Sequence, residues 1–352
     1  MNKGLSIIIL FFVHVFLLSP MLVCRVYAID NSWEIMADIP YGRLEPGVAT
    51  VNGKIYVIGG YHQGEVRFNQ EYDPKTNTWK NKTPMPTKRS SFAIAVYDNK
   101  IYCIGGGGDF PEEVTGINEV YDPETDTWET KAPMPTPRSF MDANVVNDKI
   151  YVIGGGKPMN FNNPSYVPNI NEVYDPKTDT WSTSTEPPVK VSNYASTAYA
   201  NKIYIFTKDL TLIFDPITNL WINGTSMPNP GWGAAAGATK GTFATERIYV
   251  LGGNPTFNHN QIYNPETDSW SIGAAMPTNR YGLGVVIIDD VLYALGGPGA
   301  SGMVANERYT PIGYIPEFPS WTPLLIMLVA FVAVAVVYRK KLHKQNQRSK
   351  NQ

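Results

Sequence analysis

Four arginines stand at one fixed distance from a proline. Each follows it by three residues, and together they are Arg43, Arg89, Arg138 and Arg280. A guanidinium group binds a carboxylate through paired donors. Two other segments carry Ser192-Asn193-Tyr194 and Gly231-Trp232-Gly233 at the corresponding place, and an aromatic face stacks on a sugar ring or a peptide side chain. If the fold gathers these loops, they form a site with a cationic side and an aromatic, polar side.

The element that must position these residues is a segment of about fifty residues that repeats six times, which is typical of a propeller or solenoid. A clear copy reads Lys54-Ile55-Tyr56-Val57-Ile58-Gly59-Gly60, then Tyr72-Asp73-Pro74, then Trp79. Each copy contains short apolar runs separated by turn residues such as Asn52-Gly53, and this pattern predicts four antiparallel strands. We expect the repeated tryptophans to pack between neighbouring sheets.

The two ends of the repeat array are complementary. The last copy has Gly296-Gly297 and Tyr309-Thr310-Pro311 but no tryptophan after them, whereas Trp33 stands ahead of the first glycine pair. We therefore expect the Trp33 strand to complete the last sheet, so that the first and last segments pair. Such closure removes exposed strand edges.

Gly-Gly, Tyr-Asp-Pro and Trp in this order resemble the kelch-repeat family over residues 30–311. The resemblance implies an all-β fold, a six-bladed kelch-type β-propeller closed by an N-terminal strand, to which the apolar C-terminal segment would add one transmembrane helix. It implies little about function, because this scaffold carries enzymes, adaptors and carbohydrate-binding modules.

In such a propeller, the loops between blades and the loops after the Gly-Gly pairs emerge on one face, which we call the mouth. The blades that carry the arginines are contiguous, so the arginines would form an arc there. The predicted ligand-binding residues at the mouth are Arg43, Arg89, Arg138, Arg280, Asn193, Tyr194, Trp232, Tyr281, Tyr61 and Asn254. The insertion at 156–173 would rim the same face. The alternative is that each arginine only binds backbone carbonyls of a neighbouring loop.

We interpret the chain as a non-catalytic binding module for a surface glycan or a surface protein. Two alternatives remain open, namely an epimerase of anionic sugars like the sialic-acid epimerases of this family and a purely architectural envelope protein. No nucleophile motif or His/Cys spacing of a metal site is present, so neither a metal nor a cofactor is expected. A net charge of −2 gives no general attraction to nucleic acid.

The two chain ends suggest export and anchoring. Residues 1–28 have the pattern of a signal peptide, with Lys3, an apolar run and small residues before a cleavage point. After the propeller, a Pro-rich linker (312–320) precedes an uncharged apolar segment (321–338), which is predicted to span the membrane, and a basic tail (339–352), which is predicted to be cytoplasmic. Pro316-Glu317-Phe318 with the segments after it is similar to archaeal surface-sorting signals, in which case the tail would be removed. Both interpretations place the propeller outside the cell, anchored to the membrane.

Overall fold

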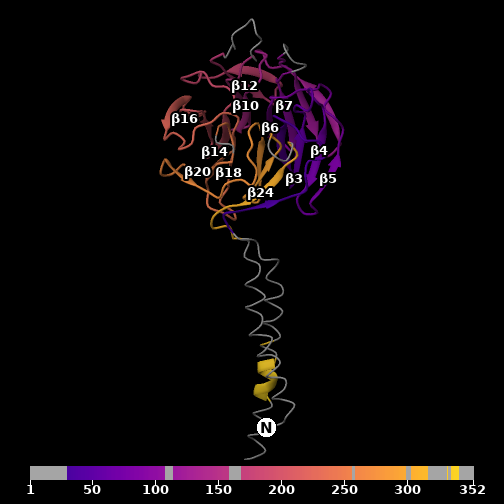
Figure 1. Ribbon diagram of the computed structural model, residues 1–352, viewed down its shortest axis with the longest axis vertical. Coiled ribbons are helices and arrows are strands. Elements are labelled where there is room, and N and C mark those ends of the chain that lie inside the picture. Colours follow the sequence, from indigo (N-terminus) through magenta and orange to yellow (C-terminus); the bar gives the residue numbers. More distant parts are fainter. Residues whose placement is uncertain are drawn as a thin grey trace, which may run out of the picture. The chain divides into compact units, whose positions relative to one another are not determined.

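The computed structural model describes residues 30–107, 114–157, 168–255, 258–298, 303–315, 331 and 334–340. Within them, six sheets of four antiparallel strands form a six-bladed β-propeller (Figure 1). The fold predicted from the repeat is confirmed.

In each blade the first strand lies at the central channel and the fourth lies outermost. Blades 1 to 3 are β2 (Gly47–Val51), β3 (Lys54–Ile58), β4 (Asn69–Asp73), β5 (Thr78–Asn81); β6 (Ala93–Tyr97), β7 (Lys100–Ile104), β8 (Asn118–Asp122), β9 (Thr127–Lys131); and β10 (Asp142–Val146), β11 (Lys149–Ile153), β12 (Asn171–Asp175), β13 (Thr180–Thr183). Blades 4 to 6 are β14 (Ala195–Tyr199), β15 (Lys202–Phe206), β16 (Thr211–Asp215), β17 (Leu220–Gly224); β18 (Ala235–Ala238), β19 (Ile248–Leu251), β20 (Asn260–Asn264), β21 (Ser269–Ile272); and β22 (Gly284–Ile288), β23 (Val291–Leu295), β24 (Asn306–Thr310), β1 (Ser32–Ile35).

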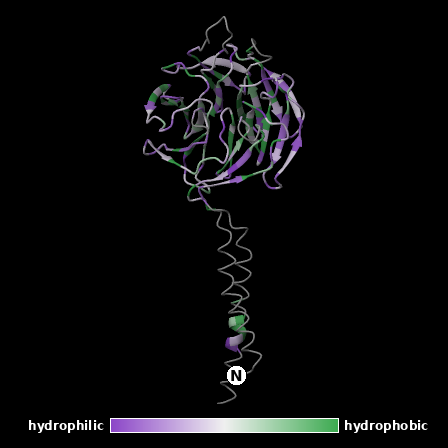
Figure 2. Ribbon diagram, in the orientation of Figure 1, coloured by the Kyte–Doolittle hydropathy of each residue, from purple (hydrophilic) through white to green (hydrophobic). Residues whose placement is uncertain are grey.

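Burial decreases from the second strand of a blade to the fourth. The second strand has four consecutive buried residues, as in Ile55–Ile58 of β3, because both of its faces pack against neighbouring blades. The outermost strand has no buried residue and is mostly exposed, with its tryptophan partly buried. In Figure 2 the outer strands at the right edge are accordingly hydrophilic, and hydrophobic residues gather further in.

The ring is closed by β1, as predicted. This strand pairs antiparallel with β24, and Trp33 lies opposite Tyr309. The two rings are 5.0 Å apart, and the indole Nε1 of Trp33 donates to the Ala274 carbonyl at 2.7 Å. The blade that ends the repeat array is therefore completed by residues from its beginning.

Each of the six repeat tryptophans joins its blade to the preceding one by a hydrogen bond as well as by packing. The six indole groups donate to a backbone carbonyl of the preceding blade at 2.7–3.1 Å. The residue that supplies this carbonyl also donates its amide N–H to an Asp or Asn side chain, which lies two positions before the tryptophan in the sequence. One residue of each blade is thus held at both its N–H and its C=O.

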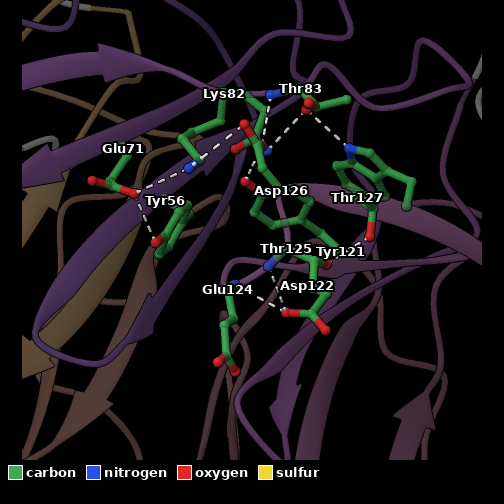
Figure 3. Close-up of polar contacts among 12 residues, drawn as sticks. Tyr56, Glu71, Lys82, Thr83, Tyr121, Asp122, Glu124, Thr125, Asp126 and Thr127 are labelled. Atoms are coloured by element: carbon green, nitrogen blue, oxygen red, sulfur yellow. Dashed lines mark hydrogen bonds and ion pairs between the residues drawn. The ribbon is translucent and has the colours of Figure 1, made fainter.

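Figure 3 shows this clamp between blades 1 and 2. The Asp126 carboxylate accepts the Thr83 amide at 2.9 Å and the Tyr121 hydroxyl at 2.6 Å, while Trp128 binds the Thr83 carbonyl at 2.9 Å. Burial opposes the charged form of Asp126, but these hydrogen bonds outweigh it and lower the pKa. The prediction that the tryptophans hold the blades together is confirmed.

The predicted segments at the chain ends fall largely outside the described residues. This holds for the signal peptide (1–28), for residues 316–320 of the linker, for most of the apolar segment and for the tail from 341 onward. Residues 334–340 are helical. In the part of the chain that the structure describes, no helix has the length and apolar character needed to cross a membrane.

Candidate functional site

The mouth is organised by one residue of each blade in the left-handed conformation. These residues precede the innermost strands, have φ between 51° and 67°, and are Glu45, Ser91, Phe140, Asn193, Gly233 and Gly282. The amide of each donates to the carbonyl of its counterpart in the preceding blade at 2.7–3.2 Å, and the series closes on itself. A continuous ring of six backbone hydrogen bonds therefore surrounds the channel at the mouth. We call it the backbone ring.

The Gly-Gly pairs permit the interblade loops to approach the blades closely. Gly59 has φ 56°, and a Cβ atom there would lie 2.6 Å from the Arg89 carbonyl oxygen. The same carbonyl accepts the Gly60 amide at 2.8 Å. No side chain fits between the loop and the strand end, which is why the repeat keeps glycine at this place.

The four arginines lie under the loops rather than at the surface. All four residues are fully buried. Arg89 donates to the carbonyls of Gly105 at 2.6 Å and Ile117 at 3.1 Å and to the carboxylate of Glu119 at 2.7 Å. Arg138 binds Glu172 and Arg280 binds Glu307 in the same way, within their own blades. The prediction of a guanidinium arc that contacts a ligand is therefore wrong, and the alternative, binding to backbone carbonyls, describes what these arginines do.

A threonine completes each of these three ion pairs. Thr87, Thr136 and Thr278 donate their hydroxyl groups to the second carboxylate oxygen of the same glutamate, at 2.6–2.9 Å. Blade 4 has an apolar set instead, with Val189, Val191 and Leu212 at the corresponding positions. Threonine, arginine and glutamate are thus replaced together, which identifies them as one packing unit.

Arg43 differs from the other three arginines because Gln70 replaces the glutamate. It donates to the Gln70 side chain and to the Phe68 carbonyl at 3.3 Å. Burial lowers the pKa of Arg43 to about 9, and no carboxylate opposes this effect. In Arg280, burial also lowers the pKa, but Glu307 counteracts it.

Of the predicted aromatic and polar residues, Tyr194 is also buried. It is 8% exposed, and its hydroxyl donates to the Ile153 carbonyl at 2.5 Å. It is therefore not exposed on the outer rim of the mouth, but it belongs to the lining of the central cavity described below. Asn193 belongs to the backbone ring and is partly exposed.

The other predicted mouth residues do reach the surface. Trp232 is 41% exposed, bridges to Asn254 in the backbone and lies edge-on to Tyr281, with ring centroids 5.3 Å apart. Tyr61 is 39% exposed. Tyr41, which the prediction did not include, is 47% exposed and stacks on Phe68. Tyr41, Tyr61 and Trp232 are exposed, and Tyr281 beside Trp232 is partly exposed. These four side chains belong to loops of blades 5, 6 and 1, which are contiguous, and we call them the aromatic rim (Tyr41, Tyr61, Trp232 and Tyr281).

A cavity of about 270 Å³ lies where the six loops converge. Residues of the backbone ring and of the first halves of the innermost strands from all six blades line it. Its charged members are Glu45 and Asp142, and the sequence prediction named neither. The insertion at 156–173 includes 158–167, which are outside the described residues. No group of three His, Cys, Asp or Glu residues suited to a metal ion occurs among the residues that the structure describes.

Comparison with known proteins agrees with this architecture. The family model of the KLHDC2/KLHL20/DRC7 Kelch-repeats domain matches residues 26–207. Human Kelch-like protein 15 is 28% identical over 182 residues, which cover 43% of this chain and 29% of that protein. Human Kelch-like protein 23 is 32% identical over 124 residues, 33% of this chain and 20% of that protein. The matches therefore span less than a third of these relatives.

A solved structure titled "Structure of YjhT" is similar in fold. It covers 78% of this chain and 96% of its own, with a TM-score of 0.66 and 16% sequence identity. At this identity the similarity shows the fold alone.

Proposed function

Because this chain belongs to the kelch-repeat family of β-propellers, we propose that it is a binding module that holds a partner protein on its mouth. Kelch propellers typically bind proteins, which supports this class of partner. The contact surface in this proposal is the aromatic rim with Asn254 beside it. It replaces the arginine arc, whose members are buried.

The observation that carries the proposal is the exposure of three large aromatic side chains at the mouth, on blades 5 and 1, with the partly exposed Tyr281 of blade 6 between them. Tyr41, Tyr61 and Trp232 are each about two-fifths exposed or more, although their bodies are apolar. Trp and Tyr are enriched among residues that dominate protein interfaces, because they bury much area at low entropic cost. The blades below them are fixed by the backbone ring, so the rim is preorganised, and this lowers the cost of binding.

The test compares the mouth with the opposite face. Trp232→Ala and Tyr61→Ala are expected to weaken partner capture by about 1–3 kcal/mol each, the range typical of interface aromatics. Ile217→Ala is the matched control, since Ile217 is 74% exposed and lies in a turn of the opposite face. A protein captured equally by wild type and both rim variants would contradict the proposal.

A glycan is the other outcome of the same experiment, since aromatic faces also stack on sugar rings. The three variants are therefore tested on a glycan array with the wild-type domain. A glycan signal that depends on Trp232, without any protein partner that does, would replace the protein by a carbohydrate ligand. The epimerase alternative rested on a basic mouth, and the burial of the four arginines gives it no support.

We also propose that binding takes place outside the cell, with the chain anchored through 321–338. The sequence patterns at 1–28 and 321–338 support this location. Protease added to intact cells should then digest the propeller and spare an epitope placed after Arg339, unless the tail has been removed. Labelling of that epitope from outside would contradict the orientation.

A further inference from the structure

The cavity beneath the backbone ring is negatively charged. Among the residues around it, Glu45 and Asp142 carry carboxylates, and none is Lys, Arg or His. The Asp142 carboxylate accepts the Ser196 hydroxyl at 2.8 Å and the Ala143 amide at 3.0 Å, and the Glu45 carboxylate accepts the Ser91 hydroxyl. All of these donors are neutral. The two carboxylates therefore face the cavity without a cationic side chain to balance them.

Keeping these carboxylates charged is costly for the folded state. Burial raises the pKa of Asp142 to about 6, and the hydrogen bonds from Ser196 and Ala143 offset only part of this effect. Burial also raises the pKa of Glu45. Groups whose pKa is shifted by burial inside a cavity are frequent at functional sites. A cation that entered the cavity would remove the penalty, so the electrostatics favour a positively charged ligand.

The remaining lining selects the shape of that cation. Val48, Ile94, Met141 and Val285 contribute apolar walls, and Asn144 and Thr197 contribute polar groups. An apolar wall beside carboxylates suits a compact charge on an alkyl stem, which is the chemistry of a lysine side chain. A planar guanidinium binds best to both oxygens of one carboxylate, whereas both oxygens of Asp142 and one of Glu45 already accept hydrogen bonds within the protein.

We propose that the central cavity binds a lysine side chain of the partner protein, with its ammonium group between Glu45 and Asp142. This inference rests on the proposed function, since the partner that covers the aromatic rim supplies the lysine. In this arrangement the aromatic rim provides most of the contact area with the partner, and the cavity selects a lysine over other residue types. The two carboxylates that line the cavity then have a role that the fold itself does not require.

The experiment measures binding of three small probes to the whole protein at pH 7.5 by NMR titration and calorimetry. The probes are N-acetyl-lysine methylamide, the norleucine analogue, which has the alkyl stem without the charge, and the arginine analogue. The lysine probe is expected to bind at least tenfold more tightly than either of the others. Asp142→Asn and Glu45→Gln should each weaken it at least tenfold. Glu266→Gln, an exposed carboxylate in a turn of blade 5, is the control and should leave the affinity unchanged.

Both cavity variants are isosteric, and their folding is checked by thermal unfolding before titration. Equal binding of the lysine and norleucine probes, the absence of lysine binding, or full lysine affinity in a folded Asp142→Asn variant would each overturn the inference. If these results occur while Trp232→Ala still weakens partner capture, the cavity assignment fails and the protein-binding function stands.

Discussion

Replacement of Arg138 by valine is expected to destabilise the propeller strongly. The guanidinium donates to the carbonyls of Gly154 at 2.6 Å and Val152 at 2.9 Å and to the carboxylate of Glu172. Its side chain and that of Glu172 are nearly inaccessible, at 1% and 2% exposure. Valine would leave a buried carboxylate without its cation and two strand-end carbonyls without a donor.

The size of the effect follows from this geometry. Breaking a buried ion pair by removal of one partner costs about 3–5 kcal/mol, because the remaining charge stays in a region of low dielectric. For a domain of this size, each kcal/mol lowers the melting temperature by roughly 2–4 °C. We therefore expect Arg138→Val to lower the melting temperature by roughly 10 °C.

The chain itself contains the compensated version of this site, because blade 4 has Val191 and Leu212 where blade 3 has Arg138 and Glu172. The double variant Arg138→Val, Glu172→Leu should therefore recover a large part of the stability, since an apolar pair of fitting volume is often as stable as the ion pair it replaces. Calorimetry of the wild type, both single variants and the double variant gives the coupling energy. An unchanged melting temperature in Arg138→Val would refute the packing role and favour the interpretation of Arg138 as a ligand-binding residue of the mouth.

Individual contacts support three further predictions. Gln70→Glu should raise the melting temperature, because it gives Arg43 the carboxylate that the other buried arginines have. A hydrogen bond to a charged group is worth about 1–3 kcal/mol. A lower melting temperature would show that the hydrogen bond from Gln70 to Asn81 contributes more to stability. Asp142→Asn should stabilise the protein by up to about 3 kcal/mol above pH 6, because the folded-state pKa is raised to about 6. The wild type loses stability as the pH rises from the pKa of Asp142 in the unfolded state through its pKa in the folded state. The stability difference between the variant and the wild type should therefore vanish below about pH 4 in a pH series of unfolding curves. A stability gain that does not depend on pH would contradict the raised pKa of Asp142. Deletion of 30–36 should expose the edge of β24 and lower the melting temperature while promoting association, as measured by calorimetry and light scattering; a monomer of unchanged stability would refute the role of the seam.

The repeat made the fold predictable in detail. Six spaced copies of the repeat defined the blades. The displaced Trp33 located the seam, because in a closed ring an extra strand at the N-terminal end can only complete the blade that lacks a strand at the C-terminal end. The role of the tryptophans followed from their size. The hydrogen bonds that hold one residue at both its N–H and C=O were not predicted, since they depend on register between blades.

The position of the arginines was predicted correctly, but the direction of their side chains was not. A long side chain that leaves a loop can reach outward to a ligand or inward to strand ends, and its residue type does not distinguish the two. The sequence did contain a useful signal in Glu119, Glu172 and Glu307, which accompany the arginines, and in Leu212, which accompanies Val191. The backbone ring had no such signal, because four of its six left-handed residues are not glycine.

The central claim, that the aromatic rim binds a partner protein, is tested most directly by a photo-crosslinking amino acid placed at Trp232 and, as control, at Ile217. Both side chains are exposed, and they lie on opposite faces of the propeller. The proposal predicts a cross-linked partner protein from position 232 that is missing from position 217. Cross-linking of the same protein from both positions, or from 217 alone, would contradict it.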